Sequence, residues 1–470
     1  MSMRMHRRYN VVAALLPILW LVAGHGDDEA HKAGMTEVDM TESVGIKNTT
    51  HNSLHNKASY AALSEQSTMI LAHAVVMVIA WGFLLPIGVM FSIARSRLTL
   101  AVHSIFFLLN ALGVLFGTVY NINTPDLYEN NAHHATGWVA TCIISVQLLI
   151  SLLSINPGRK KKTRLLVAER EPFLPLPMAN IPINRGNHIF NGLAHFIKGG
   201  IFFWYGLLTL GRWMGCFAEY GWAWNVRPSN TIPSAEFVES FVIFIYGSTN
   251  VFLEHLAAWG ATWTAQDLEH VSISVMFFGG GLCGILIESK TIRKWLTTTM
   301  GSIPIGEHVR NSQDLELRTP PKVYNSSINP IPALIIFLLG IMMSSHHQSS
   351  MVSTAVHKQW GMLLAGFSVM RMVTYTIMYI SPPTSIYPSR PPSELVSSFC
   401  LMSGGIVFMA STKDIVLWME AKNLMAMFLF TITSGLTAFI MAYEILVISL
   451  KGWATRREIQ RSSKSRVFGS

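Results

Sequence analysis

This 470-residue chain contains ten apolar runs, and each is close to the length of a helix that crosses a lipid bilayer. The hydrocarbon core is about 30 Å thick, so a spanning helix needs about 20 apolar residues. Only 13% of the residues are charged, against about a quarter in a soluble domain. The sequence therefore predicts an all-α fold, a polytopic transmembrane bundle of about 9 to 11 helices. The runs cover residues 69–93, 100–120, 135–156, 190–211, 235–256, 270–288, 329–345, 357–380, 394–412 and 422–449.

The net charge of +9 comes from short basic blocks beside the apolar runs, such as "RMHRR", "GRKKKTR" and "ATRREIQRSSKSR". Such blocks are typical of cytoplasmic flanks and contacts with lipid headgroups. We therefore expect the lipid bilayer, and no nucleic acid, as a partner. The 4 cysteines lack CxxC spacing, so neither a disulfide framework nor a zinc ribbon is indicated.

The N-terminus has the pattern of a secretory signal peptide, predicted over residues 1–24. It combines a basic start, an apolar core and a small-residue exit. Residues 25–68 then form a luminal, His-rich disordered segment, for which loose metal binding is the alternative. The sequon at Asn48 suits that side of the membrane and predicts a glycoprotein. These features place the chain in the secretory pathway, at the plasma membrane, vacuole or endoplasmic reticulum.

The remaining chain divides at two polar segments. Residues 69–156 form a first transmembrane region, and 157–187 a cytosolic linker rich in basic residues and proline. Residues 188–450 form a C-terminal multi-pass domain, followed by a basic cytosolic tail over 451–470.

The first three helices obey the positive-inside rule when their N-terminal flank is luminal. Ten crossings would then place the basic segment 289–323 and the basic tail outside. A change of one crossing between residues 190 and 290 removes both conflicts and makes the sequon at Asn325 cytosolic.

Four histidines fall into two pairs by their depth in the membrane. His73 and His133 lie at luminal helix ends, whereas His103 and His195 lie near cytosolic ends. A bis-imidazole haem needs one neutral imidazole from each side of the porphyrin, and helical bundles build such sites from facing helices. The pairing predicts two haem b groups, although a histidine at a helix end is also an ordinary interfacial residue.

Sequence likeness adds to this interpretation. The runs "LAHAVVMVIAWGFLLPIGVMFSIAR" and "HHATGWVATCIISVQLL", with His103 between them, resemble the cytochrome b561 group. The resemblance implies transmembrane electron transfer between two haems. It implies His73 with His133 as one ligand pair and His103 with His195 as the other, with Gly137 matching the glycine after the third ligand.

The chain departs from that group in two ways. The group has a further helix ahead of the first ligand, which this chain lacks unless the N-terminal segment stays uncleaved. Two further histidines also compete for ligand roles, His134 with His133 and His188 with His195.

A broader likeness covers most of the chain. The stretches "NALGVLFGTVYNINTPDLYENNAHHATGW" and "FVIFIYGSTNVFLEH" resemble fungal Ytp-type membrane proteins. That family has no settled biochemical function, so this resemblance implies a membrane protein without naming an activity.

A second group of polar residues lies between two of the later helices. Glu236 and Glu239 open one predicted helix, Glu254 closes it, and Asp267 and His270 lie at the start of the next. The spacing of Asp267 and His270 puts both on one helical face. The arrangement resembles the vertebrate transmembrane protein 45 group. Glu254, Asp267 and His270 are therefore candidate ligands for zinc or manganese, or members of a proton relay; alternatively, Asp267 simply complements the helix dipole.

A third group, His346, His347 and His357, brackets a short loop that either binds metal or is merely interfacial. Nucleotide-binding, serine-hydrolase and zinc-protease motifs are absent from the sequence, so soluble-type catalysis is not indicated.

Three hypotheses remain. In the first, the chain carries electrons from a small-molecule donor to a luminal or extracellular acceptor such as ferric or cupric ion. In the second, it is a non-enzymatic membrane protein that transports metal or protons or organises the membrane. In the third, the cytochrome-like half has lost its haem and the C-terminal helices carry the function.

Overall fold

The computed structural model describes residues 67–124, 132–154, 188–228, 232–253, 263, 265–298, 327–345, 348 and 350–467. At some helix ends it describes only the backbone. The predicted signal peptide, the segment with Asn48, the linker 157–187 and the sequon at Asn325 lie outside the described residues, so those predictions stay open.

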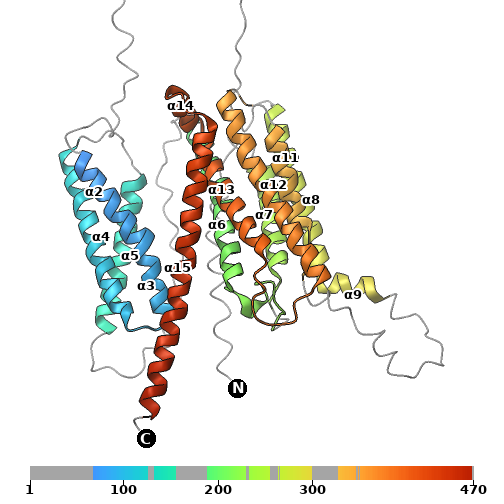
Figure 1. Ribbon diagram of the computed structural model, residues 1–470. Coiled ribbons are helices and arrows are strands. Elements are labelled where there is room, and N and C mark those ends of the chain that lie inside the picture. The colour runs from blue at the N-terminus through green and yellow to red at the C-terminus, as the bar shows by residue number, and fades with distance from the viewer. Residues whose placement is uncertain are drawn as a thin grey trace, which may run out of the picture. The chain divides into compact units, whose positions relative to one another are not determined.

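The chain forms two compact units. The N-terminal unit contains the first helices, drawn from blue to cyan in Figure 1, and includes the chain from Leu446 onward. Its helices are α2 (Ser67–Met77), η3 (Val78–Leu84), α3 (Leu85–Ile93), α4 (Leu98–Asn123) and α5 (Ala132–Ser154).

The first helix of the N-terminal unit is continuous from α2 through α3 but is wound more loosely over η3, as a π-helix. Pro86 follows directly, in the first turn of α3. Proline lacks a backbone N–H and its ring crowds the carbonyl four residues earlier, so the helix before it cannot keep regular i to i−4 bonding. Trp81 on this turn donates from Nε1 to Asn110 Oδ1 at 2.8 Å and ties the loosened turn to α4.

The C-terminal unit extends to Ile445 and contains the helices of the predicted C-terminal multi-pass domain. Its elements are α6 (His188–Met214), η4 (Ala218–Tyr220), α7 (Ala235–Leu253), α8 (Ala265–Glu288), α9 (Lys290–Thr298), α11 (Ile331–Ser345), α12 (Met351–Ile380), α13 (Pro392–Ala410), α14 (Lys413–Ala421) and α15 (Ala426–Val467), whose last part belongs to the other unit.

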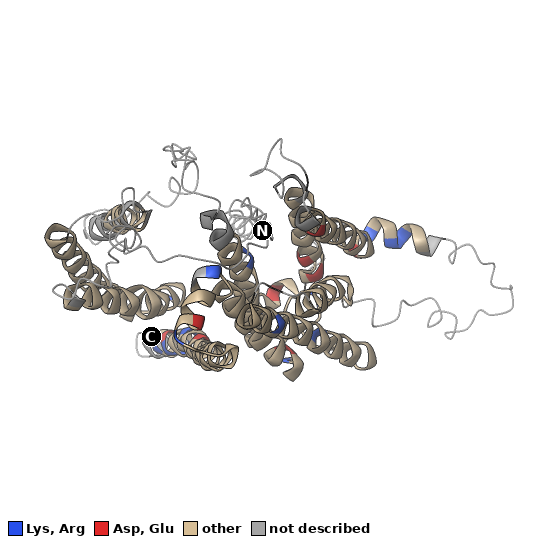
Figure 2. Cartoon of the chain, turned by 90° about the horizontal axis from the view of Figure 1, so that it is seen from above, with Lys and Arg blue, Asp and Glu red and all other residues tan. Residues whose placement is uncertain are grey.

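The predicted fold class is confirmed, because every regular element among the described residues is helical. Six of these helices are long and apolar enough to cross a membrane, and two shorter helices are also apolar. Figure 2, coloured by residue type, shows few charged positions along the long helices and several basic positions on the short, amphipathic α9. The six are Thr68–Ile93, Leu98–Asn123, Leu268–Glu288, Met351–Ile380, Pro392–Ala410 and Ala426–Ser463.

Between residues 190 and 290 the structure describes three long helices, α6, α7 and α8. These helices correspond to the predicted apolar runs 190–211, 235–256 and 270–288. Of the three, only α8 contains a candidate membrane span, at Leu268–Glu288, so the change of one crossing stays a prediction.

Helices of the C-terminal unit pack closely where glycines face one another. Gly340 on α11 and Gly361 on α12 meet so that a Cβ added to either would lie 2.6 Å from the other's carbonyl oxygen. Gly199 on α6 and Gly405 on α13 make a similar crossing. Small residues allow helix backbones to approach within a bilayer, where apolar burial gives little drive for association.

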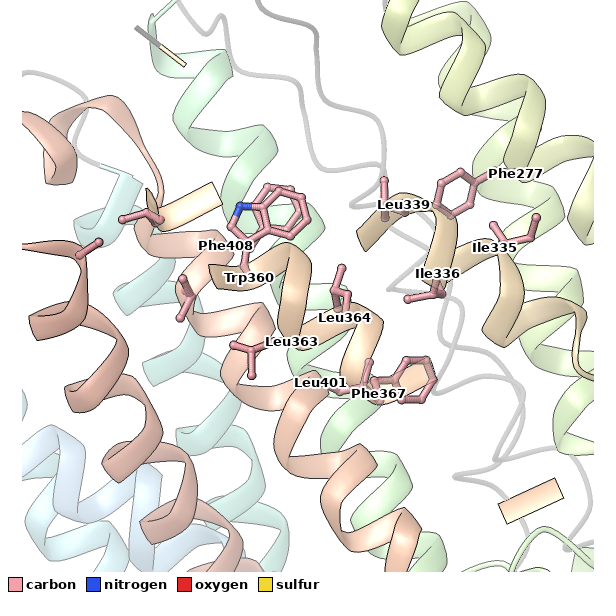
Figure 3. Packing of buried hydrophobic residues seen from close by; sticks show 13 residues of the cluster. Phe277, Ile335, Ile336, Leu339, Trp360, Leu363, Leu364, Phe367, Leu401 and Phe408 are labelled. Carbon is pink, nitrogen blue, oxygen red and sulfur yellow. The ribbon is translucent and has the colours of Figure 1, made fainter. Parts of the chain in front are cut away.

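The core of the C-terminal unit lies along α12 and its neighbours, as Figure 3 shows. Trp360 on α12 stacks face to face with Phe408 on α13, with ring centroids 4.2 Å apart. Leu364 and Phe367 continue the same face of α12, and Ile336 approaches from α11. This core holds α12 and α13 in the register that positions the charged residues described below.

Candidate functional site

The structure brings together one of the two predicted histidine pairs. The rings of His73 on α2 and His133 on α5 lie with centroids 6.2 Å apart and planes at 88°. His73 Nδ1 donates to Gly113 O on α4 at 2.8 Å. Because a carbonyl oxygen can only accept, Nδ1 carries the proton and the lone pair of His73 is on Nε2.

Glycine on α4 makes room for His73. A Cβ added at Gly117 would lie 2.8 Å from His73 Nδ1, a distance that real side chains do not show. The position of the imidazole is thus set by a hydrogen bond at Gly113 and by the absence of a side chain at Gly117. A fixed tautomer and a fixed ring are typical of histidines that bind metal.

His103 on α4 has a comparable environment. Its Nδ1 donates to Thr99 O at 2.8 Å, and its ring lies against Gly88 on α3, where an added Cβ would be 3.2 Å from Cε1. The ring also contacts Phe107. His103 is therefore oriented like His73, with its lone pair on Nε2.

His195 belongs to the C-terminal unit, where it lies beside a histidine that the sequence did not pair with it. The rings of His195 on α6 and His357 on α12 have centroids 6.3 Å apart and planes at 88°. His357 is buried and donates from Nδ1 to Ser353 O at 2.9 Å. Since His103 and His195 fall in separate units, their pairing stays a prediction.

The predicted metal site at Glu254, Asp267 and His270 lies largely outside the described side chains. Glu254 is not described, and of Asp267 only the helical backbone at the start of α8 is. His270 is half-buried, and its carbonyl oxygen accepts from Ser274 Oγ at 3.0 Å. No group of three metal-binding side chains occurs among the described residues. The backbone placement agrees with the predicted spacing, and the site stays a prediction.

Five charged side chains from four helices are buried together at one end of the C-terminal unit. We call them the buried charge network: Arg212 on α6, Glu236 and Glu239 on α7, Arg371 on α12 and Glu394 on α13. Their side chains are 0% to 11% exposed. Burial of an unpaired charge is strongly unfavourable, so these groups are held by one another.

Glu239 joins the two arginines of the network. Its Oε1 lies 2.7 Å from Arg212 Nη1 and 3.3 Å from Arg371 Nη1. Arg212 Nη2 also lies 3.4 Å from Glu236 Oε1, and Arg371 Nε lies 2.7 Å from Glu394 Oε1. The ion pairs thus form one unbroken chain through α6, α7, α12 and α13.

Trp224 covers the network. Its ring is 4.4 Å from the Arg212 guanidinium carbon and 5.7 Å from that of Arg371, distances at which cation–π attraction acts. Trp224 has φ 51°, which costs a bulky residue about 1–3 kcal/mol. Ser389 Oγ donates to Trp224 O, and Arg212 Nε donates to Trp222 O at 2.7 Å. These contacts hold the backbone in its unfavourable conformation.

The loop that carries Trp224 is fastened to the loop between α12 and α13. Asn225 Nδ2 donates to Ile386 O at 2.7 Å, and Val226 N donates to Ser385 O at 2.9 Å. Both loops lie at the network's end of the unit, so this end is closed by main-chain contacts as well as by charge.

Sequence reasoning noted Glu236 and Glu239 but missed Arg212, Arg371 and Glu394. A signal was present, because Arg371 interrupts the apolar run "GMLLAGFSVMRMVTYTIMYI". An ionisable residue within a membrane helix marks a functional or structural site by default.

Two known protein families match parts of this chain. Residues 177–452, more than half of the chain, match the family described as Protein YTP1-like, C-terminal. The chain belongs to the YTP1-like family. Residues 54–155, which include the first three spans, match a domain of unknown function, DUF2427. The predicted Ytp-type resemblance is thereby confirmed, whereas the likenesses to cytochrome b561 and transmembrane protein 45 stay predictions.

Relatives of this YTP1-like chain occur in two yeasts. An uncharacterized membrane protein of Schizosaccharomyces pombe is 31% identical in an alignment that covers 84% of this chain and 96% of the relative. An uncharacterized membrane protein of Saccharomyces cerevisiae is 44% identical over 58% of this chain and 44% of its own length. Protein YTP1 of Saccharomyces cerevisiae is 24% identical over 51% of this chain and 42% of its own length. No solved structure matches the chain.

Proposed function

We propose that the N-terminal unit is a haem-binding redox module of a transmembrane electron carrier, with His73 and His133 as the ligands of one haem b. The observation that carries the proposal is the approach of these two rings, which come from separate helices, to a centroid distance of 6.2 Å.

The distance fits two imidazoles that would hold one metal ion between them. A metal to imidazole nitrogen bond is about 2 Å, so two rings on opposite sides of a metal ion have centroids about 6 Å apart. The hydrogen bond from His73 Nδ1 to Gly113 O leaves Nε2 as the coordinating nitrogen. Gly117 leaves the space that His73 needs. The spacing of the rings and the tautomer of His73 therefore suit a bis-imidazole site.

His103 and His195 are the proposed ligands of the second haem. Support comes from the bond of His103 Nδ1 to Thr99 O, which again presents Nε2. His357 is a competing partner for His195, because the two rings lie 6.3 Å apart within one unit. A His357→Ala variant that keeps two haems per chain would favour the original pairing.

Bound haem supplies reversible one-electron chemistry, which protein side chains lack. The role of this chain would be to fix the imidazoles and to exclude water with apolar helices. With haem bound, the chain would connect a small-molecule electron donor with an acceptor. Ferric or cupric ion is the acceptor class that we propose, because a His-rich segment precedes the first helix.

Variants of two adjacent histidines test the proposal. The haem content of detergent-purified full-length protein would be measured by pyridine haemochrome assay. We expect His133→Ala to lose one haem per chain, because an axial ligand is gone, and His134→Ala to retain both. The pair is matched in position and chemistry. Equal haem content in the two variants would refute the assignment of His133.

A further inference from the structure

The buried charge network contains more acidic than basic groups. It joins two guanidinium groups to three carboxyl groups. With all five ionised it would carry one uncompensated negative charge in a setting where no side chain is more than 11% exposed. A low-dielectric interior strongly disfavours such a charge. One bound proton makes the network neutral.

We propose that the buried charge network is a proton-binding site, with Glu394 as the carboxyl group that holds the exchangeable proton. The proposal concerns the C-terminal unit and does not depend on haem binding. Release of the proton converts the Glu394 carboxylic acid to a carboxylate and delivers H⁺ to water, with no change of oxidation state.

Glu236 lies 3.4 Å from Arg212 and lines a pocket, whereas Glu239 and Glu394 lie away from that pocket and differ in how many arginines they contact. Glu239 lies against both arginines, at 2.7 and 3.3 Å, and is best paired as a carboxylate. Glu394 Oε1 lies 2.7 Å from Arg371 Nε, Thr374 is the other polar side chain that acts on the carboxyl group, and neither carboxyl oxygen makes a hydrogen bond of ordinary geometry in the described part of the chain. Glu394 is also fully buried. An unpartnered oxygen is less costly in a neutral acid than in an anion.

The surroundings of Glu394 comprise groups of both signs. The charges that act on it are those of Arg371 on its neighbour α12, Arg212 on α6 and Glu239 on α7. Tyr205 on α6 and Tyr375 on α12 are the other titratable groups around Arg371. Arg212 is shared by Glu236 and Glu239, and Arg371 by Glu239 and Glu394, so two arginines face three carboxyl groups.

Glu236 is the carboxyl group of the network that lies against a pocket. It lines a small pocket together with Arg212 and Trp224. The same pocket is lined by Ser327, from the segment before α11. Because Glu236 belongs to the chain of ion pairs that ends at Glu394, we expect the proton to exchange on this side, beneath Trp224.

Proton loss would alter how this end of the unit is held. When Glu394 is neutral, the charges of the two arginines are balanced by the carboxylates of Glu236 and Glu239, and α7, α12 and α13 pack around a neutral network. After release, one uncompensated charge remains among apolar helices, and the closed arrangement of the Trp224 loop becomes less favourable. The C-terminal unit therefore couples proton occupancy to the closure of this end.

Infrared spectroscopy of the full-length protein in lipid nanodiscs tests the proposal directly. A protonated carboxylic acid gives a carbonyl stretch that a carboxylate lacks and that shifts in D₂O when the proton exchanges. Another carboxyl group, Glu444 on α15, also has an unbonded buried oxygen. The measurement is therefore made in a Glu444→Gln background, so that Glu444 is silent.

We expect Glu444→Gln protein to show an exchangeable acid band near neutral pH. The band disappears in the double variant with Glu394→Gln, an isosteric change, and persists in the matched double variant with Glu219→Gln, an exposed residue at the same end. An undiminished band after Glu394→Gln would overturn the assignment. A Glu444→Gln protein without any exchangeable acid band would overturn the proposal even where the double variant does not fold.

Discussion

At the scale of single residues, the proposed haem site depends on a glycine as much as on its ligands. His73 is set by Gly113 O on one side and by the missing side chain of Gly117 on the other. Outer contacts of this kind fix the tautomer and direction of a coordinating imidazole. The ligand could not keep its place if either contact changed.

We predict that Gly117→Ala weakens haem binding about tenfold, the lower end of the range for altered outer contacts of a metal ligand. The new Cβ would lie 2.8 Å from His73 Nδ1 and displace the ring. Gly82→Ala is the control, because an added Cβ there meets nothing within 4 Å. The measurement is a haem titration of apoprotein followed by absorbance. Equal affinities in the two variants would show that Gly117 does not position His73.

A second prediction at the residue scale concerns an arginine of the buried charge network. Arg371→Gln removes one partner of Glu239 and Glu394 and leaves buried carboxyl groups without their cation. We expect the free energy of unfolding to fall by about 3–5 kcal/mol. Thermal unfolding in detergent, followed by circular dichroism, measures the loss. Arg456→Gln, at an exposed position of α15, should change stability little, and a similar loss there would contradict this account.

At the scale of helices, the C-terminal unit is assembled at glycine crossings. The α11 and α12 backbones meet at Gly340 and Gly361, and α6 meets α13 at Gly199 and Gly405. Gly404 on α13 lies against Leu363 and Leu364 on α12, the same pair of helices that brings Arg371 to Glu394. Packing of small residues and burial of ion pairs are therefore two parts of one arrangement.

We predict that Gly340→Ala destabilises the protein by about 1–3 kcal/mol, as overpacking does. The added methyl group would lie 2.6 Å from Gly361 O and force the helices apart. Gly435→Ala on α15 is the control, because the site is open and alanine favours helix. Chemical unfolding in mixed micelles compares the two. A Gly340→Ala protein as stable as the control would mean that this crossing is not close.

The helices themselves were largely predictable, because apolar length is a local property of the sequence. All ten apolar runs correspond to described helices. Local spacing also singled out His73 and His133 as polar residues at the ends of apolar runs. It could not reveal that His357 lies beside His195 or that Arg371 lies beside Glu394. Those contacts depend on which helices are neighbours, which apolar patterns specify poorly when nearly every face is apolar.

At the scale of the whole molecule, the account assigns different chemistry to the two units. The N-terminal unit presents imidazoles with fixed tautomers, and the C-terminal unit buries a network with an odd carboxyl group. Electron transfer and proton binding are complementary activities, because a reduced centre gains negative charge that a proton offsets. The YTP1-like chain would then combine both in one membrane protein.

The most direct measurement is a dithionite-reduced minus oxidised visible spectrum of the full-length protein, purified in detergent after expression with ample haem. The account predicts a sharp low-spin b-type band and close to two haems per chain. Protein that is folded but shows no haem band under these conditions would contradict the proposed redox module.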